Sequence, residues 1–499
     1  MVGTQAFAMH GIVCSVTSMN EEEASSEYGP QTNAFKTLVE KVYFHRLPSY
    51  GNSVFYSLGF LALTCLMLLV VTGTLMGFMG QLWWLHTPWG VFVRSVHLWT
   101  VQAFMFILIL HFLVGFSTSG FRAPRRMVWV FGACIFCLAI IQTEFGYGLR
   151  GDFASQFRAV SGADFWNGAY LGYWLNPLNY TQTFVLHVAI IPLIIFFLFL
   201  AHYLLEHTYG IARPYRKDIP YTMVSADHTV LFLRGGGLVA LILALAFFFH
   251  SPYVPAVTIA DIAQLSPHLV ATTLLQEFDH TSNTATYFDS IDPYTFDTRQ
   301  VYVVSPYEAY RTSGRDQGPD AWIAFRAESS SQRQAAIAAA YRFAAATDTS
   351  AFASSTNPVI AMLNTLMPMA RNGTYESILD GEVPSINNTY SLRLLVDMGI
   401  PEERAAVLHM DTEQWGMVKD ETGSVWKLPP GSWWMMPLAI VNSVFNLPNR
   451  LYGDRDAAFL LGFFMLIFIL FPYIPYLNRL PEFFSFAAYI QKDRAPPTS

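Results

Sequence analysis

The chain has 499 residues, of which 53% are hydrophobic and 13% are charged, whereas an ordinary soluble domain has roughly 25% charged residues. This composition indicates a membrane protein. The formal net charge is −7 and the sequence has no basic run or zinc-finger spacing, which argues against a nucleic-acid-binding protein. The four cysteines are too few for a disulfide framework.

The first 35 residues form an N-terminal extension that contains an acidic run at 21–23. The extension lacks a basic start followed by an apolar core, so we do not expect it to be a cleaved signal peptide. Insertion into a membrane would then depend on the segments that follow.

Six apolar segments come close to the about 20 residues that a helix needs to cross the hydrocarbon core of a bilayer. They lie at 54–78, 92–116, 127–145, 184–205, 231–249 and 457–473, and the last is short. A further apolar stretch at 433–446 is too short to span comfortably, so it either lies along the interface or re-enters the bilayer. We therefore predict an all-α membrane protein with a four-helix bundle, two further transmembrane helices and a soluble insertion of mixed or helical structure.

Basic residues concentrate in alternate connections of these segments. They are Lys36, Lys41 and Arg46 before the first segment, Arg122, Arg125 and Arg126 after the second, and Arg213, Arg216 and Lys217 after the fourth. By the positive-inside rule, both termini are expected on the inner side, which is the cytoplasm or its equivalent. Residues 251–432 hold 21 Asp and Glu against 11 Lys and Arg, and this acidic region is expected on the outer side. It is long enough to be a folded domain, with a helix predicted at 334–346.

Two of the apolar segments contain histidine pairs. His97 and His111 are fourteen residues apart, and His187 and His202 are fifteen apart. In a helix, each pair spans about 21 to 22 Å and returns to within about 40° or 60° of one face. A single histidine in an apolar helix is more often a packing residue, but four at matched depths predict two metal sites, because ionisable residues inside a membrane are costly. His97 would face His187 and His111 would face His202, as in haems with two axial imidazoles.

The neighbouring segments repeat this spacing in glycines. Gly59 and Gly73, and likewise Gly132 and Gly146, are fourteen residues apart. A glycine facing a porphyrin leaves room that a Cβ would fill, and small-residue helix packing is the alternative. Arg94, near a membrane surface, is a candidate partner for a haem propionate, the alternative being an ordinary interfacial arginine.

These features resemble the cytochrome b family of bc complexes and their photosynthetic bf counterparts. The matching features are the two glycine pairs, RSVHLW at 94–99, FGYGL at 145–149, the His187/His202 pair and, more weakly, PNRLYG at 448–453. The fifteen-residue spacing resembles the bf branch and some bacterial branches.

The resemblance implies two haems b, an outer low-potential haem held by His97 and His187 and an inner haem held by His111 and His202. It also implies an outer quinol-oxidising site and an inner quinone-reducing site. His207 and Asp227 match inner-site residues that give protons to the reduced quinone, and a structural role for His207 is the alternative. The implied partners are a Rieske-type iron–sulfur protein, a c-type cytochrome or plastocyanin-like acceptor, and a second copy of the complex.

The resulting division is an extension at 1–35, a four-helix dihaem core at 36–210, a connection and helix at 211–250, the insertion at 251–430, an interfacial helix and the last span at 431–477, and a tail at 478–499.

The outer site departs from the family pattern. Gly431, Ser432, Trp433 and Trp434 stand where the family has Pro, Glu, Trp and Tyr, and Arg150-Gly151 replaces Pro-Trp. Serine cannot serve as a carboxylate base. Asp152 or a carboxylate of the insertion is a candidate substitute, and because Ser57 is not cysteine, no covalent haem is expected.

Three functions remain open at this point. The first is quinol oxidation coupled to electron transfer through two haems. The second is a dihaem membrane wire without an active outer quinol site. The third is a non-redox membrane scaffold or transporter.

Overall fold

The computed structural model describes residues 46–214, 220–286, 296–314, 318–345, 356–381, 389–408, 410, 429–445, 447, 453–483 and 486–492. The N-terminal extension, four of the basic residues (Lys36, Lys41, Arg216 and Lys217) and most of the PNRLYG segment lie outside these ranges.

All six expected spans are long apolar helices, and the predicted all-α membrane fold is confirmed. They are α2 (Val54–Met79), α4 (Pro88–Ser117), α5 (Arg126–Gly148), a continuous helix from Tyr180 to Tyr209, α9 (His228–Phe248) and α21 (Gly453–Leu470). Large apolar side chains on these helices face outward, including Phe197 at 60% exposure and Phe248 at 72%. A surface of this kind is stable in lipid and not in water, so the chain is an integral membrane protein.

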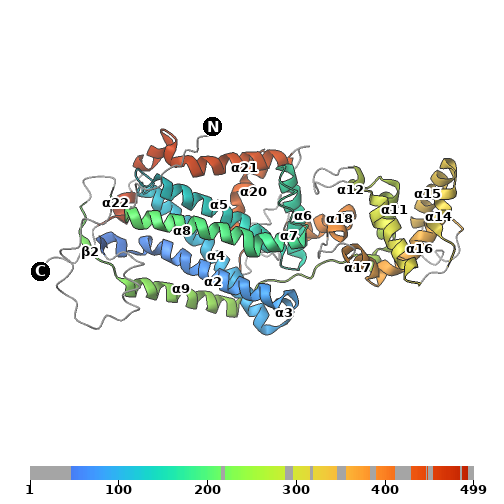
Figure 1. Cartoon of the computed structure of the whole chain (residues 1–499), viewed down its shortest axis with the longest axis horizontal. Helices are drawn as coiled ribbons and strands as arrows, with labels where there is room; N and C mark the ends of the chain where they lie inside the picture. The colour runs from blue at the N-terminus through green and yellow to red at the C-terminus, as the bar shows by residue number, and fades with distance from the viewer. Residues whose placement is uncertain are drawn as a thin grey trace, which may run out of the picture.

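The spans form an elongated bundle, in which α2 packs against α4, α5 packs against α8 (Ile191–Tyr209), and α9 packs against both α2 and α4 (Figure 1). At one end, called the far end here, β1 (Arg46–Pro48) pairs antiparallel with β2 (Met223–Ser225). The other end, called the insertion end, faces the insertion, which is the part of the sequence between α9 and α20 (Met436–Phe445). It also includes the short helix α3 (Gln81–His86).

Helix α6 (Phe153–Gly168) lies across the insertion end of the bundle and was not predicted from the sequence. Its start is fixed by a capping box, in which the Asp152 side chain accepts from the backbone N–H of Ser155 while Ser155 Oγ accepts from the backbone N–H of Asp152. On one side α6 contacts α5 and α21, and on the other it contacts α18 (Thr389–Asp397) and α19 (Ile400–Val407). It therefore joins the membrane bundle to the insertion.

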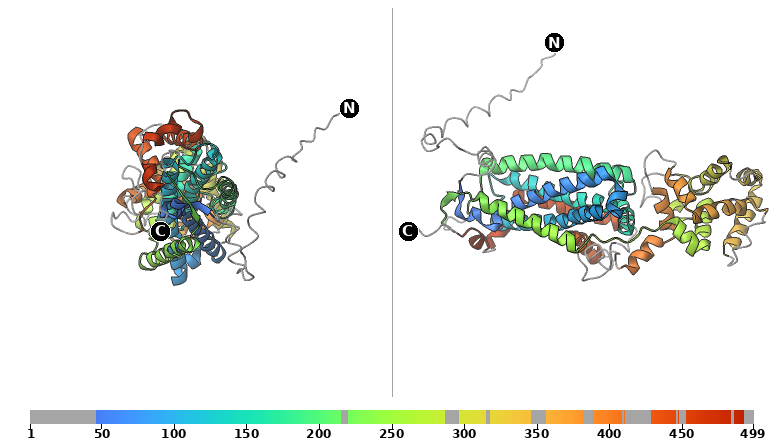
Figure 2. Two further views of the ribbon diagram at one scale, coloured as in Figure 1. Left: turned by 90° about the vertical axis from the view of Figure 1, so that its left-hand side faces the viewer. Right: turned by 90° about the horizontal axis from the view of Figure 1, so that it is seen from below.

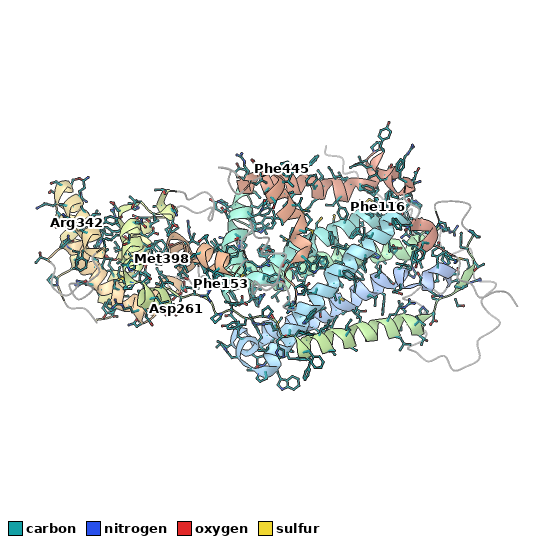
Figure 3. All side chains as sticks on the ribbon, turned by 180° about the vertical axis from the view of Figure 1, so that it is seen from behind. Phe116, Phe153, Asp261, Arg342, Met398 and Phe445 are labelled. Carbon is teal, nitrogen blue, oxygen red and sulfur yellow. The ribbon has the colours of Figure 1, made fainter. Side chains whose placement is uncertain are left out.

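The insertion is a cluster of helices beyond α6, and its described part is helical (Figure 2). Besides α18 and α19, its helices are α10 (Ile259–Leu265), α11 (Pro267–Asp279), α12 (Asn283–Thr286), η3 (Gln300–Val304), α13 (Ser305–Thr312), α14 (Ala321–Ala327), α15 (Ser330–Ala344), α16 (Pro358–Arg371) and α17 (Thr374–Gly381). The helix expected at 334–346 is α15. The apolar core of the insertion includes side chains of α6, among them Phe153, which lies at the junction labelled in Figure 3.

The chain enters the insertion through a segment that is tied to the bundle by hydrogen bonds. Ser251 N–H donates to Ser95 Oγ on α4, and Phe153 N–H donates to the Val254 carbonyl. Gln156 on α6 pairs with both backbone groups of Val257. These bonds satisfy an irregular backbone at the membrane surface and fix where the insertion begins.

The last part of the chain returns to the bundle. A short helix, η6 (Trp433–Met435), leads into α20, and α21 is followed by η8 (Phe471–Tyr473), η9 (Leu477–Phe483) and α22 (Phe486–Ile490). Helix α20 contacts α21, and α22 contacts α4. The described part of the apolar stretch, 433–445, is thus helical, and Trp434 near its start is buried in the bundle at 4% exposure.

A buried carboxyl predicts a pH dependence for the insertion. Glu277 on α11 is fully buried, and this burial together with the neighbouring Asp397 carboxyl raises the pKa of Glu277 from 4.5 to about 9. The folded insertion then holds a proton that the unfolded chain releases, so its stability is greatest below about pH 4.5 and falls as the pH rises toward 9.

The loss of stability between pH 4.5 and 9 is on the order of a few kcal/mol, and we expect Glu277→Gln to remove most of it. The measurement is hydrogen exchange of the α11 amides in the full chain between pH 5 and 9, corrected for intrinsic exchange rates. Glu308→Gln, at an exposed position on α13, is the matched control. An equal loss of protection with pH in wild type and Glu277→Gln would contradict the assignment.

Candidate functional site

His97 on α4 and His187 on the facing helix lie opposite each other near the insertion end. Their ring centroids are 6.4 Å apart and their planes are inclined by 69°. Two metal–nitrogen bonds of about 2 Å each, together with the two ring radii, account for a separation of this size. The space between the rings therefore fits one metal ion with two axial imidazoles.

Hydrogen bonds fix the orientation and tautomer of these rings. Thr72 Oγ1 donates to the Leu68 carbonyl at 2.7 Å, so it accepts from Nδ1–H of His97 at 2.8 Å. Nδ1–H of His187 donates to the Gln142 carbonyl at 2.9 Å. Each imidazole therefore presents an unprotonated Nε2, which is the form that binds a metal, with its other nitrogen held by a second group.

The second pair, His111 and His202, lies about 21 Å along α4 from the first. Nδ1–H of His202 donates to the Val128 carbonyl of α5 at 2.9 Å, the same arrangement as at His187. His111 and His202 interact electrostatically across the bundle, and both are also close to the charged pair Arg125 and Glu206. The sequence-predicted partners are thus brought together at both ends.

A π-turn explains why a spacing of fifteen residues still presents one face. The turn η2 (Leu186–Ile190) follows α7 (Tyr180–Val185), contains His187, and is closed by a bond from Ile191 N–H to the Leu186 carbonyl, five residues earlier. A π-turn takes up one extra residue, so the fifteen residues from His187 to His202 rotate about as far as fourteen residues of ordinary helix. The two imidazoles therefore lie closer to one face than the offset of about 60° expected from the sequence. Such turns are frequent at functional sites.

Each of the four predicted glycines faces one of the four histidines. A Cβ on Gly146 would lie 2.6 Å from Cε1 of His187, and a Cβ on Gly73 would lie 3.2 Å from Cε1 of His97. The corresponding distances are 3.2 Å for Gly132 and His202, and 3.4 Å for Gly59 and His111. In this structure the glycines make room for the imidazole ring itself, whereas the sequence analysis expected room for a porphyrin.

Arg94 is buried at 6% exposure beside the first pair, three residues before His97. Its Nη2 donates to the Ser251 and Pro252 carbonyls, whereas its buried Nε and Nη1 have no hydrogen-bond partner. A buried guanidinium with unused donors fits an anionic group such as a propionate. Among the described residues, no three His, Cys, Asp or Glu side chains converge on a metal site. Paired histidines suffice for a haem, whose macrocycle supplies the remaining ligands.

The segment before α20 inserts between α4 and α5. Trp433 Nε1 donates to Gln102 Oε1 at 2.8 Å, and Gln102 Nε2 donates to the Pro430 carbonyl at 2.8 Å. Trp434 Nε1 donates to Thr143 Oγ1 on α5 at 3.1 Å. Ser432 is 1% exposed, and its Oγ has no hydrogen-bond partner.

The two residues predicted for the inner site are both exposed at the far end of the bundle. His207 packs its ring 5.9 Å from that of Tyr203. The Asp227 carboxylate accepts from Val230 N–H and caps α9. Asp227 thus has a structural role at the start of the helix, and quinone binding by either residue stays a prediction.

Sequence reasoning missed two residues of the insertion end. Thr72 holds His97, and its position directly before Gly73 was the available signal. Glu144 is a carboxylate inside the apolar span α5, where an ionisable residue is costly enough to suggest a function. Its neighbour Arg158 belongs to α6, a helix that was not predicted.

The family model described as cytochrome b (N-terminal)/b6/petB matches residues 102–261, a range that contains His111, His187 and His202. This part of the chain is a cytochrome b domain. Cytochrome b6 of Heliobacterium modesticaldum is 28% identical over 196 residues, covering 34% of this chain and 90% of the relative. Cytochrome b6 of Synechococcus sp. RCC307 is 27% identical over 199 residues, covering 36% and 91%.

A chain of the solved structure "Hyperthermophilic respiratory Complex III" is also similar, with 17% identity and a TM-score of 0.36, covering 69% of this chain and 95% of that chain. The cytochrome b6 relatives span about a third of this chain. The helices of the insertion from α11 onward, and α20 and α21, lie beyond the cytochrome b domain that the family model matches.

Proposed function

We propose that the chain binds two haems b, one between His97 and His187 and one between His111 and His202, and transfers electrons across the membrane. The observation that supports this most strongly is the facing of His97 and His187 at 6.4 Å, with both Nδ1 atoms engaged so that both Nε2 atoms are available to a metal. The haems would supply one-electron carriers near each membrane surface.

The residues of the chain would then bind and orient these groups. Thr72 and the carbonyls of Gln142 and Val128 hold three of the four imidazoles by Nδ1. The four glycines let the rings stand upright between helices, and Arg94 would neutralise a propionate at the insertion end. Between the pairs, α4 buries Phe104, Met105 and Leu108. This apolar surrounding keeps water out of the path and influences the reduction potentials.

We infer that the chain acts as a subunit of a quinol oxidoreductase complex. This is supported by the cytochrome b domain and by the b6 relatives, of which the chain covers about nine tenths. Quinol would be oxidised near the insertion end and quinone reduced near the far end, where His207 and Asp227 are the proposed proton donors. A Rieske-type iron–sulfur protein, a c-type or plastocyanin-like acceptor and a second copy of the complex are the proposed partners.

The proposed orientation places the far end and both termini on the inner side and the insertion on the outer side. The described basic residues of three connections, Arg46, Arg122, Arg125, Arg126 and Arg213, belong to the far end, in agreement with the positive-inside rule. The insertion would then be an outer domain of 251–430 resting on α6.

Quinol oxidation by the purified complex tests this function. We expect b-type bands in a reduced-minus-oxidised spectrum and quinol-dependent reduction of a one-electron acceptor that outer-site inhibitors abolish. Absence of b-type bands would contradict both electron-transfer functions.

The second candidate is a dihaem wire without an outer quinol site. It is favoured by Ser432, whose buried hydroxyl stands where a carboxylate base is expected and cannot take that role. Haem reduction and turnover that are insensitive to outer-site inhibitors would establish the wire and exclude quinol oxidation at that end.

A further inference from the structure

The proposed quinol oxidation needs a proton acceptor at the insertion end, and Asp152 is the substitute that the sequence analysis names by residue. Asp152 has a fully buried carboxylate, of which Oδ2 accepts from Arg150 at 2.8 Å and Oδ1 from Ser155 N–H at 3.0 Å. One oxygen thus caps α6 and the other is bound by Arg150. The structure supplies a different carboxylate, Glu144.

Glu144 lies on α5 near the insertion end and points toward α6. Its Oε2 is 3.7 Å from Nη1 of Arg158, and its Oε1 would be 3.5 Å from a Cβ on Gly162. The side chain is 18% exposed, whereas that of Arg158 is 7% exposed. Arg158 therefore balances the negative charge from the buried side, while part of the Glu144 side chain stays exposed.

Arg158 links this carboxylate to an aromatic hydroxyl group. Tyr147, one turn after Glu144, lies under the guanidinium of Arg158, with 4.0 Å from Cζ to the ring centroid. Its buried Oη has no hydrogen-bond partner. Tyr147 and Trp434 belong to the same buried cluster, and Trp434 is bonded to Thr143, the residue before Glu144. Arg158 of α6 thus contacts both a carboxylate and an unused phenol of α5, and η6 is bonded to the residue before that carboxylate.

This set of groups suits a ligand that carries hydroxyl groups, as a quinol does. Tyr147 Oη offers an unused donor or acceptor, and Glu144 can take a proton. Isolated charges inside a membrane are costly, and a carboxylate kept there beside an arginine is a functional group by default.

We propose that Glu144 accepts a proton from the quinol at the insertion end, in place of the carboxylate that Ser432 lacks. The proposal depends on the proposed quinol oxidation. One O–H bond of the quinol breaks and its proton passes to the Glu144 carboxylate. The second proton would leave to water, and the haem at that end and a high-potential iron–sulfur partner would each accept one of the two electrons.

The test uses Glu144→Gln in the purified complex, with Glu482→Gln as matched control. Glu482 pairs with Arg122 at the far end of the bundle, away from this site. We expect Glu144→Gln to lower kcat for quinol oxidation by on the order of 100-fold, the typical contribution of a general base, while KM and the haem spectrum stay near wild type. Glu482→Gln should turn over normally.

Two further measurements separate a proton acceptor from a structural ion pair. Glu144→Asp retains a carboxylate and should keep more turnover than Glu144→Gln, whereas a purely structural pair would make both variants lose haem together. In redox-induced infrared difference spectra, a carboxylic-acid band should form with quinol in wild type and be absent from Glu144→Gln. This second readout does not depend on turnover.

Glu144→Gln with turnover within twofold of wild type, or with an unchanged carboxylic-acid band, would overturn the role of Glu144. Loss of haem in both Glu144→Gln and Glu144→Asp would likewise overturn it in favour of a structural pair. A wild-type complex that binds haem but does not oxidise quinol would instead contradict the proposed function itself.

Discussion

His202→Ala should reduce the haem content of the purified chain from two haems to one. The substitution removes one of two axial ligands at the far end, and the Nδ1 bond to Val128 that orients it, while His97 and His187 keep their partners. The reduced-minus-oxidised spectrum should lose the bands of the inner haem and keep those of the outer, low-potential haem. Haem extraction and quantification against protein gives the ratio directly.

His86→Ala is the control for this variant, because His86 is an exposed residue of α3 outside both pairs. It should retain both haems. Loss of both haems in His202→Ala would show that haem binding is coupled to folding of the bundle. Retention of both would contradict ligation by His202.

Gly146→Leu should prevent binding of the outer haem. Even a Cβ at this position would lie 2.6 Å from Cε1 of His187, a distance that real structures essentially never show. The ring can escape only by turning, which would break its bond to the Gln142 carbonyl and redirect Nε2 away from His97. The expected result is a chain with the inner haem alone, measured by the same spectrum and haem quantification.

Gly236→Leu is a matched change on the transmembrane helix α9, where an added Cβ meets nothing within 4 Å. Replacing glycine in a helix gains up to about 1 kcal/mol from propensity, so this control should insert and bind haem normally. Full haem content in Gly146→Leu would mean that the glycine serves helix packing alone.

The membrane spans and the histidine-bearing helix faces could be predicted from composition and from the spacing of residues along the sequence. Six apolar segments predicted six spans, because about 20 residues are needed for each crossing. The spacing of His97 and His111 predicted two imidazoles on one face, and the structure places His97 opposite His187 and His111 within electrostatic range of His202.

Features set by tertiary contacts were not predictable in the same way. The π-turn at His187 depends on how α8 packs against α5, and its sequence contains no signal beyond the fifteen-residue spacing. The sequence of α6 mixes polar and apolar residues without a distinctive pattern. The position of this helix is set by its packing against the core of the insertion and against α21. Because α6 was missed, the pair of Glu144 and Arg158 was missed with it.

The glycines illustrate a prediction that named the right residues with an incomplete reason. Spacing alone pointed to Gly59, Gly73, Gly132 and Gly146. The distances show that each Cβ would first meet an imidazole ring, because these rings stand between neighbouring helices.

A density map of the purified chain from cryo-electron microscopy would show whether the four histidines hold two haems. We expect a flat macrocycle with a central metal between Nε2 of His97 and Nε2 of His187, and a second between His111 and His202. Side chains or lipid filling the space between either pair, with no metal density, would contradict it.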